Sequence, residues 1–282
     1  MAIPYPEILH YKTADVAYSW TDRDAILYAM GIGMGEDPLF DPELGYVYER
    51  DLKVLPTFAT IIARAADPGP LPVNRLLVLD GGRDLTIHTP LSGSASVVMD
   101  GRIMGVVDKG ESKGAIITRE VVIRDASTRV EIATLRSNMF ARGDGGFGGP
   151  QGGGSEADKR PSRAPDRTVE IATRRNQALL YRLSGDRNPL HSDPVVASKA
   201  GFARPILHGL CTYGICCRAI LESYGDFEPS ALARIAARFA APAFPGETIA
   251  VDFWANGRQL DFEARVKERG ATIVKFGKAE LR

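Results

Sequence analysis

The spacing of apolar residues predicts that the first half of the chain combines helices with a sheet. One helix is predicted over Thr21 to Gly31, where a capping threonine precedes apolar residues at helical spacing, and a shorter helix near Pro56 to Ala65. Later segments alternate apolar and polar residues with many β-branched positions, as half-buried strands do. These predicted strands are Ser94 to Val107, Gly114 to Arg124 and Glu131 to Phe140.

The second half repeats this plan. Helices are predicted over Val169 to Leu183 and Gly209 to Tyr224, with one further turn over Val195 to Ala200, and the Gly209 helix is apolar on all sides. Turn dipeptides follow, of which Asn256-Gly257 is a strong two-residue hairpin signal. The pattern predicts an α+β protein in which an antiparallel sheet wraps around a buried helix. The predicted strands are Ala233 to Phe239, Thr248 to Ala255, Leu260 to Glu268 and Ala271 to Leu281.

The two halves are separated by a segment of glycine, proline and charged residues that has almost no aliphatic side chains, from Gly143 to Asp166. A chain of 282 residues with 44% hydrophobic content is long enough for two ordinary cores. We therefore expect a first domain at residues 1–142, a linker at 143–168 and a second domain at 169–282.

Composition excludes several classes of partner. Lys and Arg number 35, as do Asp and Glu, so no net charge attracts nucleic acid or an anionic membrane. No apolar run approaches the roughly 20 residues of a membrane span, and Met1 to Leu9 does not resemble a signal peptide. Cys211, Cys216 and Cys217 fit neither a disulfide framework nor a zinc spacing. We expect a soluble, intracellular protein whose cysteines are reduced and buried.

Candidate chemistry is concentrated between Tyr181 and Gly209, which contains Asp186-x-Asn188-x-x-His191. Pro189 prevents regular helix here and favours an extended backbone at Asn188, so a turn must arrange Asp186 and His191. Glycine and Asx residues suit such a turn. Taken alone, the motif is also compatible with an ordinary polar loop.

The stretch resembles the signature of the R-specific enoyl-CoA hydratase family (hydratase 2, MaoC-like). The resemblance extends through both halves, to members with two domains and to the hydratase region of peroxisomal multifunctional enzymes. Its motifs are Tyr181, Ser184-Gly185-Asp186, Asn188-Pro189-Leu190-His191, Ala197, His208-Gly209, Arg238-Phe239, Pro242-x-Phe244-Pro245-Gly246-Glu247-Thr248, Tyr48, Val54-Leu55-Pro56-Thr57-Phe58 and Arg142-Gly143-x-Gly145-Gly146-Phe147-Gly148-Gly149.

The resemblance implies a double hot-dog fold, with antiparallel sheets wrapped around central helices, and reversible hydration of trans-2-enoyl-CoA to (R)-3-hydroxyacyl-CoA. Such a reaction needs a base beside Cβ and hydrogen-bond donors at the thioester oxygen. Asp186 and His191 are expected to activate the water, with Asn188 holding Asp186 and the water network. The backbone N–H of Gly209, at a helix N-terminus, is expected to stabilise the oxyanion.

Contacts to the substrate and its coenzyme A portion are expected from His208, Arg142, Gly146 and Phe147. Two of these assignments leave alternatives open. His208 is expected rather to satisfy backbone groups at the entry to the helix. The glycine-rich segment Gly145 to Gly149 is either plain linker or a coenzyme A contact.

Neither a metal nor another cofactor is expected. The spacing of Asp186, His191, Asp193 and His208 matches no standard ligand pattern, and hydration of an activated alkene needs no Lewis acid. The protein partner is expected to be a second copy of the chain, in a homodimer. The expected location is cytoplasmic, or peroxisomal in a eukaryote, although the chain shows no C-terminal peroxisomal signal.

The first half lacks its own D-x-N-x-x-H motif and reads Asp80-Gly81-Gly82 where relatives often read His-Gly-Glu. One active site per chain is therefore expected, with the first domain forming the acyl pocket. Two other readings of the chain stay open: dehydration of hydroxyacyl groups on acyl carrier protein, and a non-catalytic acyl-CoA sensor. Thioester hydrolysis is disfavoured by the hydratase signature.

Overall fold

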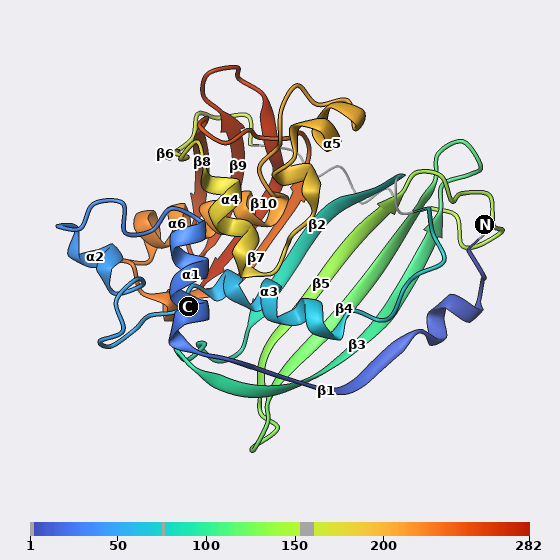
Figure 1. Cartoon of the computed structure of the whole chain (residues 1–282), viewed down its shortest axis with the longest axis horizontal. Helices are drawn as coiled ribbons and strands as arrows, with labels where there is room; N and C mark the ends of the chain where they lie inside the picture. Colours follow the sequence, from blue (N-terminus) through green and yellow to red (C-terminus); the bar gives the residue numbers. More distant parts are fainter. Residues whose placement is uncertain (1–2, 75–76, 153–160) are drawn as a thin grey trace.

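The computed structural model describes residues 3–74, 77–152 and 161–282, and all its named strands belong to one antiparallel sheet (Figure 1). The order of the ten strands is β1-β3-β4-β5-β2-β7-β10-β9-β8-β6. The strands are β1 Lys12–Trp20, β2 Val78–Ile87, β3 Ala95–Asp108, β4 Ala115–Asp125, β5 Glu131–Ala141, β6 Arg167–Ala172, β7 Leu232–Phe239, β8 Thr248–Asn256, β9 Gln259–Val266 and β10 Thr272–Leu281.

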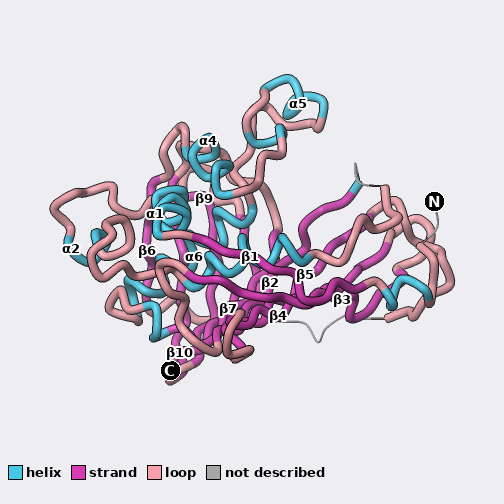
Figure 2. Tube along the Cα trace, turned by 60° about the horizontal axis from the view of Figure 1, so that its bottom comes forward, coloured by secondary structure: helices cyan, strands magenta, loops and turns pink. Residues whose placement is uncertain are grey.

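The helices lie mainly in the connections that follow the first strand of each half. In Figure 2 the strands of the first half form a curved layer, and α4 and α5 lie at the top of the view. The α-helices are α1 Asp22–Gly31, α2 Asp41–Leu44, α3 Ala59–Ile62, α4 Gln177–Tyr181, α5 Pro194–Lys199 and α6 Gly209–Tyr224. The 3-10 turns are η1 Glu7–His10, η2 Pro56–Phe58, η3 Ala63–Ala66, η5 Arg182–Ser184, η6 Pro189–His191 and η7 Pro229–Ala231.

The strand order reveals an internal repeat. From the outer edge inward, the first half runs β1-β3-β4-β5-β2 and the second half β6-β8-β9-β10-β7, which is the same order of strands. The two innermost strands, β2 and β7, pair antiparallel and place Leu85 opposite Ile235. The molecule is therefore built from two units of the same topology, joined by backbone hydrogen bonds into one sheet.

The long helix α6 forms the centre of the core. Most of its side chains are buried, including all three cysteines, which are free as expected. Its counterpart in the first half is the short run η2-α3-η3, whose α3 crosses the face of the sheet in Figure 1. One cluster of buried apolar side chains includes residues of both halves. The halves thus share a continuous hydrophobic core.

Buried polar contacts also join the two halves. Arg218 of α6 forms an ion pair with Glu43 of α2 and donates a hydrogen bond to the backbone oxygen of Gly33. The hydroxyl of Tyr46 donates to the backbone oxygen of Phe227. Because the loss of one partner from a buried pair is strongly destabilising, these contacts fix how the second half docks on the first.

Most predicted elements are confirmed to within a few residues, and α6 has the predicted bounds. Thr21 and Asp24 form a capping box at the start of α1. The loop between β8 and β9 is a two-residue hairpin, shifted by one position from the predicted Asn256-Gly257, because Asn256 pairs with Gln259.

The predicted helix over Val169 to Leu183 is wrong in its first part. Residues Arg167–Ala172 form the edge strand β6, and helix α4 begins only at Gln177. The physical reason is the period of two in this segment: Val169 and Ile171 are buried while their neighbours face solvent. Pairing with β8 satisfies the backbone of this alternating segment.

Strands β1 and β2 were not predicted. Each strand contains a register shift, and each has neighbouring positions that are both exposed or partly exposed. These positions interrupt the alternation of buried and exposed side chains that is typical of a strand. Within the described ranges, no helix is long and apolar enough to cross a membrane.

Replacement of Gly214 by valine is expected to destabilise the contact between α6 and α1. A Cβ atom at Gly214 would lie 2.7 Å from Cγ2 of Ile32 and 2.8 Å from the hydroxyl oxygen of Tyr28, and both neighbours are fully buried. Overpacking of this kind costs about 1–3 kcal/mol of unfolding free energy, measurable by urea denaturation. Gly105→Val is the control, because a Cβ there meets nothing within 4 Å. Equal stabilities of the two variants would contradict this account of the interface.

Candidate active site

The Asp186 motif forms the turn that its sequence predicts. Gly185 ends η5 with φ +118°, in the left-handed region that favours glycine, and Asn188 has φ −55° and ψ 123° before Pro189. The side-chain oxygen of Asn188 accepts a hydrogen bond from the backbone N–H of Leu190 (3.0 Å), and the Asp186 carboxylate accepts one from the backbone N–H of Asn188 (3.2 Å). The turn therefore holds one oxygen of the Asp186 carboxylate through a local hydrogen bond.

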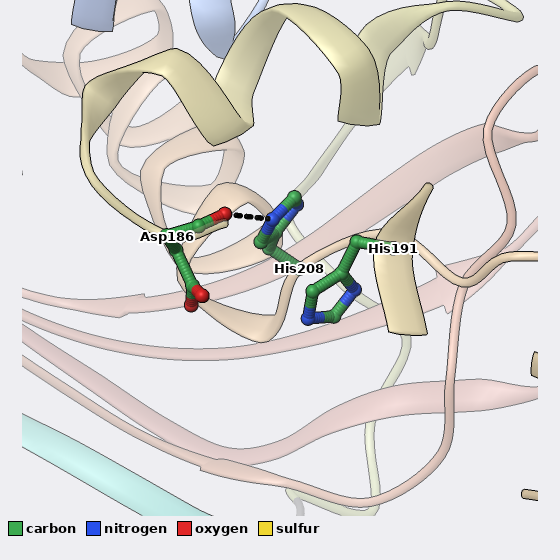
Figure 3. Close-up of side chains that lie close together, drawn as sticks. All are labelled: Asp186, His191 and His208. Atoms are coloured by element: carbon green, nitrogen blue, oxygen red, sulfur yellow. Dashed lines mark hydrogen bonds between the residues drawn. The ribbon is translucent and has the colours of Figure 1, made fainter. Parts of the chain in front are cut away.

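The turn brings Asp186 and His191 together with His208, the residue before α6 (Figure 3). Possible ligand atoms of the three side chains all lie within 4.8 Å of one another, and the two imidazole rings stack with centroids 3.7 Å apart. His208 is 1% exposed and His191 is 9% exposed. The predicted pair is thus assembled, with a second histidine packed against it.

Hydrogen bonds to backbone carbonyls define which ring nitrogens carry protons. Nδ1 of His191 lies 2.9 Å from the backbone oxygen of Ile206, and Nε2 of His208 lies 3.1 Å from that of Asp186. A carbonyl oxygen can only accept, so each of these nitrogens is protonated and donates. Neutral His191 therefore has its lone pair on Nε2, which is the ring nitrogen that can accept a hydrogen bond.

Asp186 also forms an ion pair with Arg64, which belongs to η3 in the first half of the chain. Nη1 of Arg64 lies 2.9 Å from Oδ2 of Asp186, and the side chains are 40% and 22% exposed. Arg64 was not among the predicted site residues. A signal was nevertheless present, because Arg64 is the sole charged residue in the apolar run from Val54 to Ala66.

Burial and neighbouring charges set the protonation states. Burial raises the pKa of Asp186, but attraction to Arg64 and hydrogen bonds outweigh it, so the pKa lies below its ordinary value. Burial lowers the pKa of His191. Burial, followed by the charge of His191, lowers the pKa of His208 to about 4. At neutral pH the site therefore holds a carboxylate beside two neutral imidazoles.

The same three side chains form a possible metal-ligand group among the residues that the structure describes. One oxygen of the carboxylate is engaged by Arg64, whereas each imidazole keeps one nitrogen that does not donate to a carbonyl. The guanidinium charge also opposes a second cation at that carboxylate. The Arg64 ion pair therefore argues against a metal at this carboxylate, and the absence of a metal stays a prediction.

A cavity of about 490 Å³ opens beside His191. Two arginines contribute to its lining, Arg175 before the motif turn in the sequence and Arg204 after it. Neither was among the predicted site residues. All its lining residues belong to the second half of the chain: Arg175, Ala178, Leu179, His191, Ser192, Arg204, Pro205, Pro245 and Gly246. The lining combines apolar side chains with two arginines, a histidine and a serine, so the cavity suits a polar or charged portion of a small molecule.

The other predicted residues of this region have defined positions. Gly209 is the first residue of α6, and its missing Cβ would lie 3.5 Å from the ring of Phe239, an ordinary contact distance. His208 does satisfy a backbone group, that of Asp186, but its side chain makes no capping bond to α6. Asp193 accepts from the backbone N–H of Val195 (2.8 Å) and caps α5.

The remaining predicted contact residues lie at the end of β5 and beyond. Gly146 and Gly148 donate their backbone N–H groups to the carboxylate of Asp108, at 2.8 and 2.9 Å. The ring of Phe147 packs 6.1 Å from that of Tyr5. The glycine-rich loop is thus folded around a carboxylate of the same chain. Contact of Arg142, Gly146 and Phe147 with coenzyme A stays a prediction.

Comparison with known families matches both halves of the chain. Residues 156–275 match the MaoC like domain, and residues 18–143 match the MFE-2 hydratase 2 N-terminal domain. The chain is 41% identical over 285 residues to the enoyl-CoA hydratase ChsH3 of Mycobacterium tuberculosis, with 98% of each chain covered.

Solved structures show the same architecture. A MaoC-like dehydratase from Phytophthora capsici superposes with a TM-score of 0.88 at 30% identity, covering 99% of each chain. A conserved hypothetical protein of Mycobacterium tuberculosis with a double hotdog fold has a TM-score of 0.51 at 12% identity, covering 96% of this chain and 97% of the other. The latter likeness concerns the fold alone and agrees with the predicted double hot-dog arrangement.

The depressed pKa of His208 is expected to make the protein less stable in weak acid. The unfolded chain takes up a proton near pH 6.5, whereas folded His208 resists protonation down to about pH 4, so the free energy of unfolding should fall as pH decreases through this window. The contribution of Asp186 is lost only at lower pH, because its pKa is depressed below 3.8. Urea unfolding at several pH values should give a smaller slope for His208→Asn. An unchanged slope would show that His208 is not buried in its neutral form.

Proposed function

We infer that this chain, which belongs to the MaoC-like dehydratase family, catalyses the reversible hydration of trans-2-enoyl-CoA to (R)-3-hydroxyacyl-CoA. The observation that carries the proposal is the meeting of an ionised carboxylate, Asp186, with the free Nε2 of neutral His191 beside a cavity. Membership of the family and the 41% identity to an enoyl-CoA hydratase support the same reaction.

In the proposed mechanism, Asp186 and His191 hold one water molecule at Cβ of the enoyl thioester. An ionised carboxylate and a neutral imidazole both accept hydrogen bonds, so they orient the water and take up its proton as the oxygen attacks. One O–H bond breaks, a C–O bond forms at Cβ, and the electron pair of the alkene moves toward the thioester. Return of a proton to Cα on the same side completes the addition of water.

The thioester oxygen gains negative charge during this step and needs a donor. Gly209 is the first residue of a 16-residue helix, and the first N–H groups of any helix lack an acceptor within it. We assign the N–H of Gly209 to the oxyanion, supported by the positive end of the α6 dipole. The backbone N–H of Asn188 donates a hydrogen bond to the Asp186 carboxylate. Through this bond Asn188 is proposed to position Asp186 as a base.

The cavity at His191 is proposed to admit the acyl-CoA. Arg175 and Arg204 line it and suit the phosphate groups of coenzyme A. The first half is proposed to shape the acyl pocket, as the resemblance implies. Assembly as a homodimer and a cytoplasmic or peroxisomal location also stay predictions.

Acyl carrier protein is the alternative carrier of the substrate, since the same arginines at the cavity also suit an acidic protein surface. Comparison of turnover with crotonyl groups on coenzyme A and on acyl carrier protein distinguishes the two. A folded protein that binds acyl-CoA but turns over neither substrate would instead support the sensor reading. The assay follows loss of enoyl absorbance, and chiral analysis of the product tests the R configuration.

Asp186→Asn and His191→Ala are each expected to lower kcat by on the order of 10² to 10⁴, the usual contribution of general acid–base catalysis. Folding and coenzyme A binding should be largely retained. Asp193→Asn is the matched control, because Asp193 lies in the same segment but only caps α5. Near wild-type kcat in either active-site variant would refute the assigned roles.

Gly209→Ala is expected to fold normally and lose activity. The added Cβ meets the Phe239 ring at an ordinary 3.5 Å, so packing should be little disturbed. The methyl group would hold the thioester away from the N–H donor, and displacements of about 1 Å can cost on the order of 10² in rate. Kinetics on crotonyl-CoA and a thermal unfolding curve provide the test. If Gly209→Ala were both stable and fully active, the assignment of the oxyanion site to the N-terminus of α6 would be wrong.

A further inference from the structure

The segment that contains Arg64 is otherwise apolar and closely packed. The residues around Arg64 in α3 and η3 are buried, among them Ile61, Ile62, Ala63 and Ala66. The Arg64 side chain leaves this packed segment and reaches the carboxylate of Asp186 in the other half of the chain. A rigid support therefore presents one positive charge to the candidate site.

The carboxylate of Asp186 is held on both of its oxygens. Oδ1 accepts the backbone N–H of Asn188 at 3.2 Å, from within the motif turn, and Oδ2 contacts Nη1 of Arg64 at 2.9 Å. Asp186 lies on a loop, and one hydrogen bond would leave the plane of its carboxylate free to rotate. A second anchor from the opposite side removes that rotation.

We propose that Arg64 is a positioning residue of the active site, contributed by the half of the chain that lacks the catalytic motif. It orients the Asp186 carboxylate toward the water and keeps that carboxylate ionised beside neutral imidazoles. This inference rests on the proposed hydratase function. It assigns the first half a part in the chemistry, in addition to its proposed role in forming the acyl pocket.

The groups that face Asp186 determine whether loss of Arg64 raises or lowers the pKa values in the site. These are the guanidinium of Arg64, the imidazoles of His191 and His208, and the phenol of Tyr181, which burial keeps uncharged by raising its pKa. Arg64 lowers the pKa of Asp186 and also lowers that of both histidines. Its removal should therefore raise the pKa of all three groups.

Activity requires Asp186 ionised and His191 neutral, so the acid limb of the rate profile should move to higher pH when Arg64 is lost. Loss of the Arg64 charge moves this limb whatever else the side chain does, so the rate constants separate the remaining roles. A purely structural role would lower stability and leave kcat of the folded protein unchanged. A direct contact between Arg64 and substrate would raise KM and leave kcat unchanged.

The experiment compares the full-length wild type with Arg64→Met and Arg64→Lys. Arg64→Met should lower kcat by roughly 10- to 100-fold, as expected for loss of a hydrogen bond to a charged group, and move the acid limb of kcat/KM upward. Lysine keeps the charge and should restore the position of the limb, although not the full rate, because it lacks the planar fork of arginine.

Arg119→Met is the matched control. Nη1 of Arg119 lies 2.9 Å from Oδ2 of Asp67, directly after η3, so this ion pair has the same length near the same segment but does not contact the site. Its removal should leave kcat and the pH profile unchanged. A shift of equal size in Arg119→Met would show that general destabilisation causes the effect, and would overturn the proposal.

An activity-independent readout distinguishes failure of this inference from failure of the proposed function. The chain has four histidines, so imidazole NMR signals can be assigned with single substitutions. The pKa of His191 should be higher in Arg64→Met than in the wild type, even if crotonyl-CoA proves not to be a substrate. An unchanged imidazole pKa, or a change in KM alone, would overturn the positioning role.

Discussion

Burial of α6 on all sides is the constraint on which the rest of the molecule depends. A helix that exposes almost no side chain to solvent must be enclosed, and the strands of the second half and the docked first half together provide the enclosure. This fixes the N-terminal end of α6 in space. His208, directly before α6, is thereby placed against the Asp186 turn.

Sequence alone predicted the features that depend on local chemistry. The continuous apolar run from Gly209 to Tyr224 predicted α6. The turn at Gly185 and Pro189 predicted that Asp186 and His191 lie close together. Sequence alone failed at Arg167–Ala172, which was assigned to a helix although Val169 and Ile171 alternate with residues that face solvent. This period of two spans only six residues at a sheet edge, where pairing with β8 completes the strand.

The contribution of Arg64 was hidden for a related reason. Its partner is distant in the sequence and lies in the other structural repeat, so no motif spacing connects them. A lone charge inside an otherwise apolar helical run is nevertheless a departure from the pattern, and it marks the side of the run on which the chain meets solvent or a charged partner.

Joining the two repeats at β2 and β7 also leaves few open sheet edges. Two separate five-stranded sheets would have four edges, whereas the continuous sheet has two, formed by β1 and β6. β6 is only six residues long, and β1 is interrupted by an irregularity near Asp15, whose φ is +51°. Short or distorted edges are poor templates for pairing with strands of other molecules. The fusion that builds the site therefore also protects the chain against edge-to-edge aggregation.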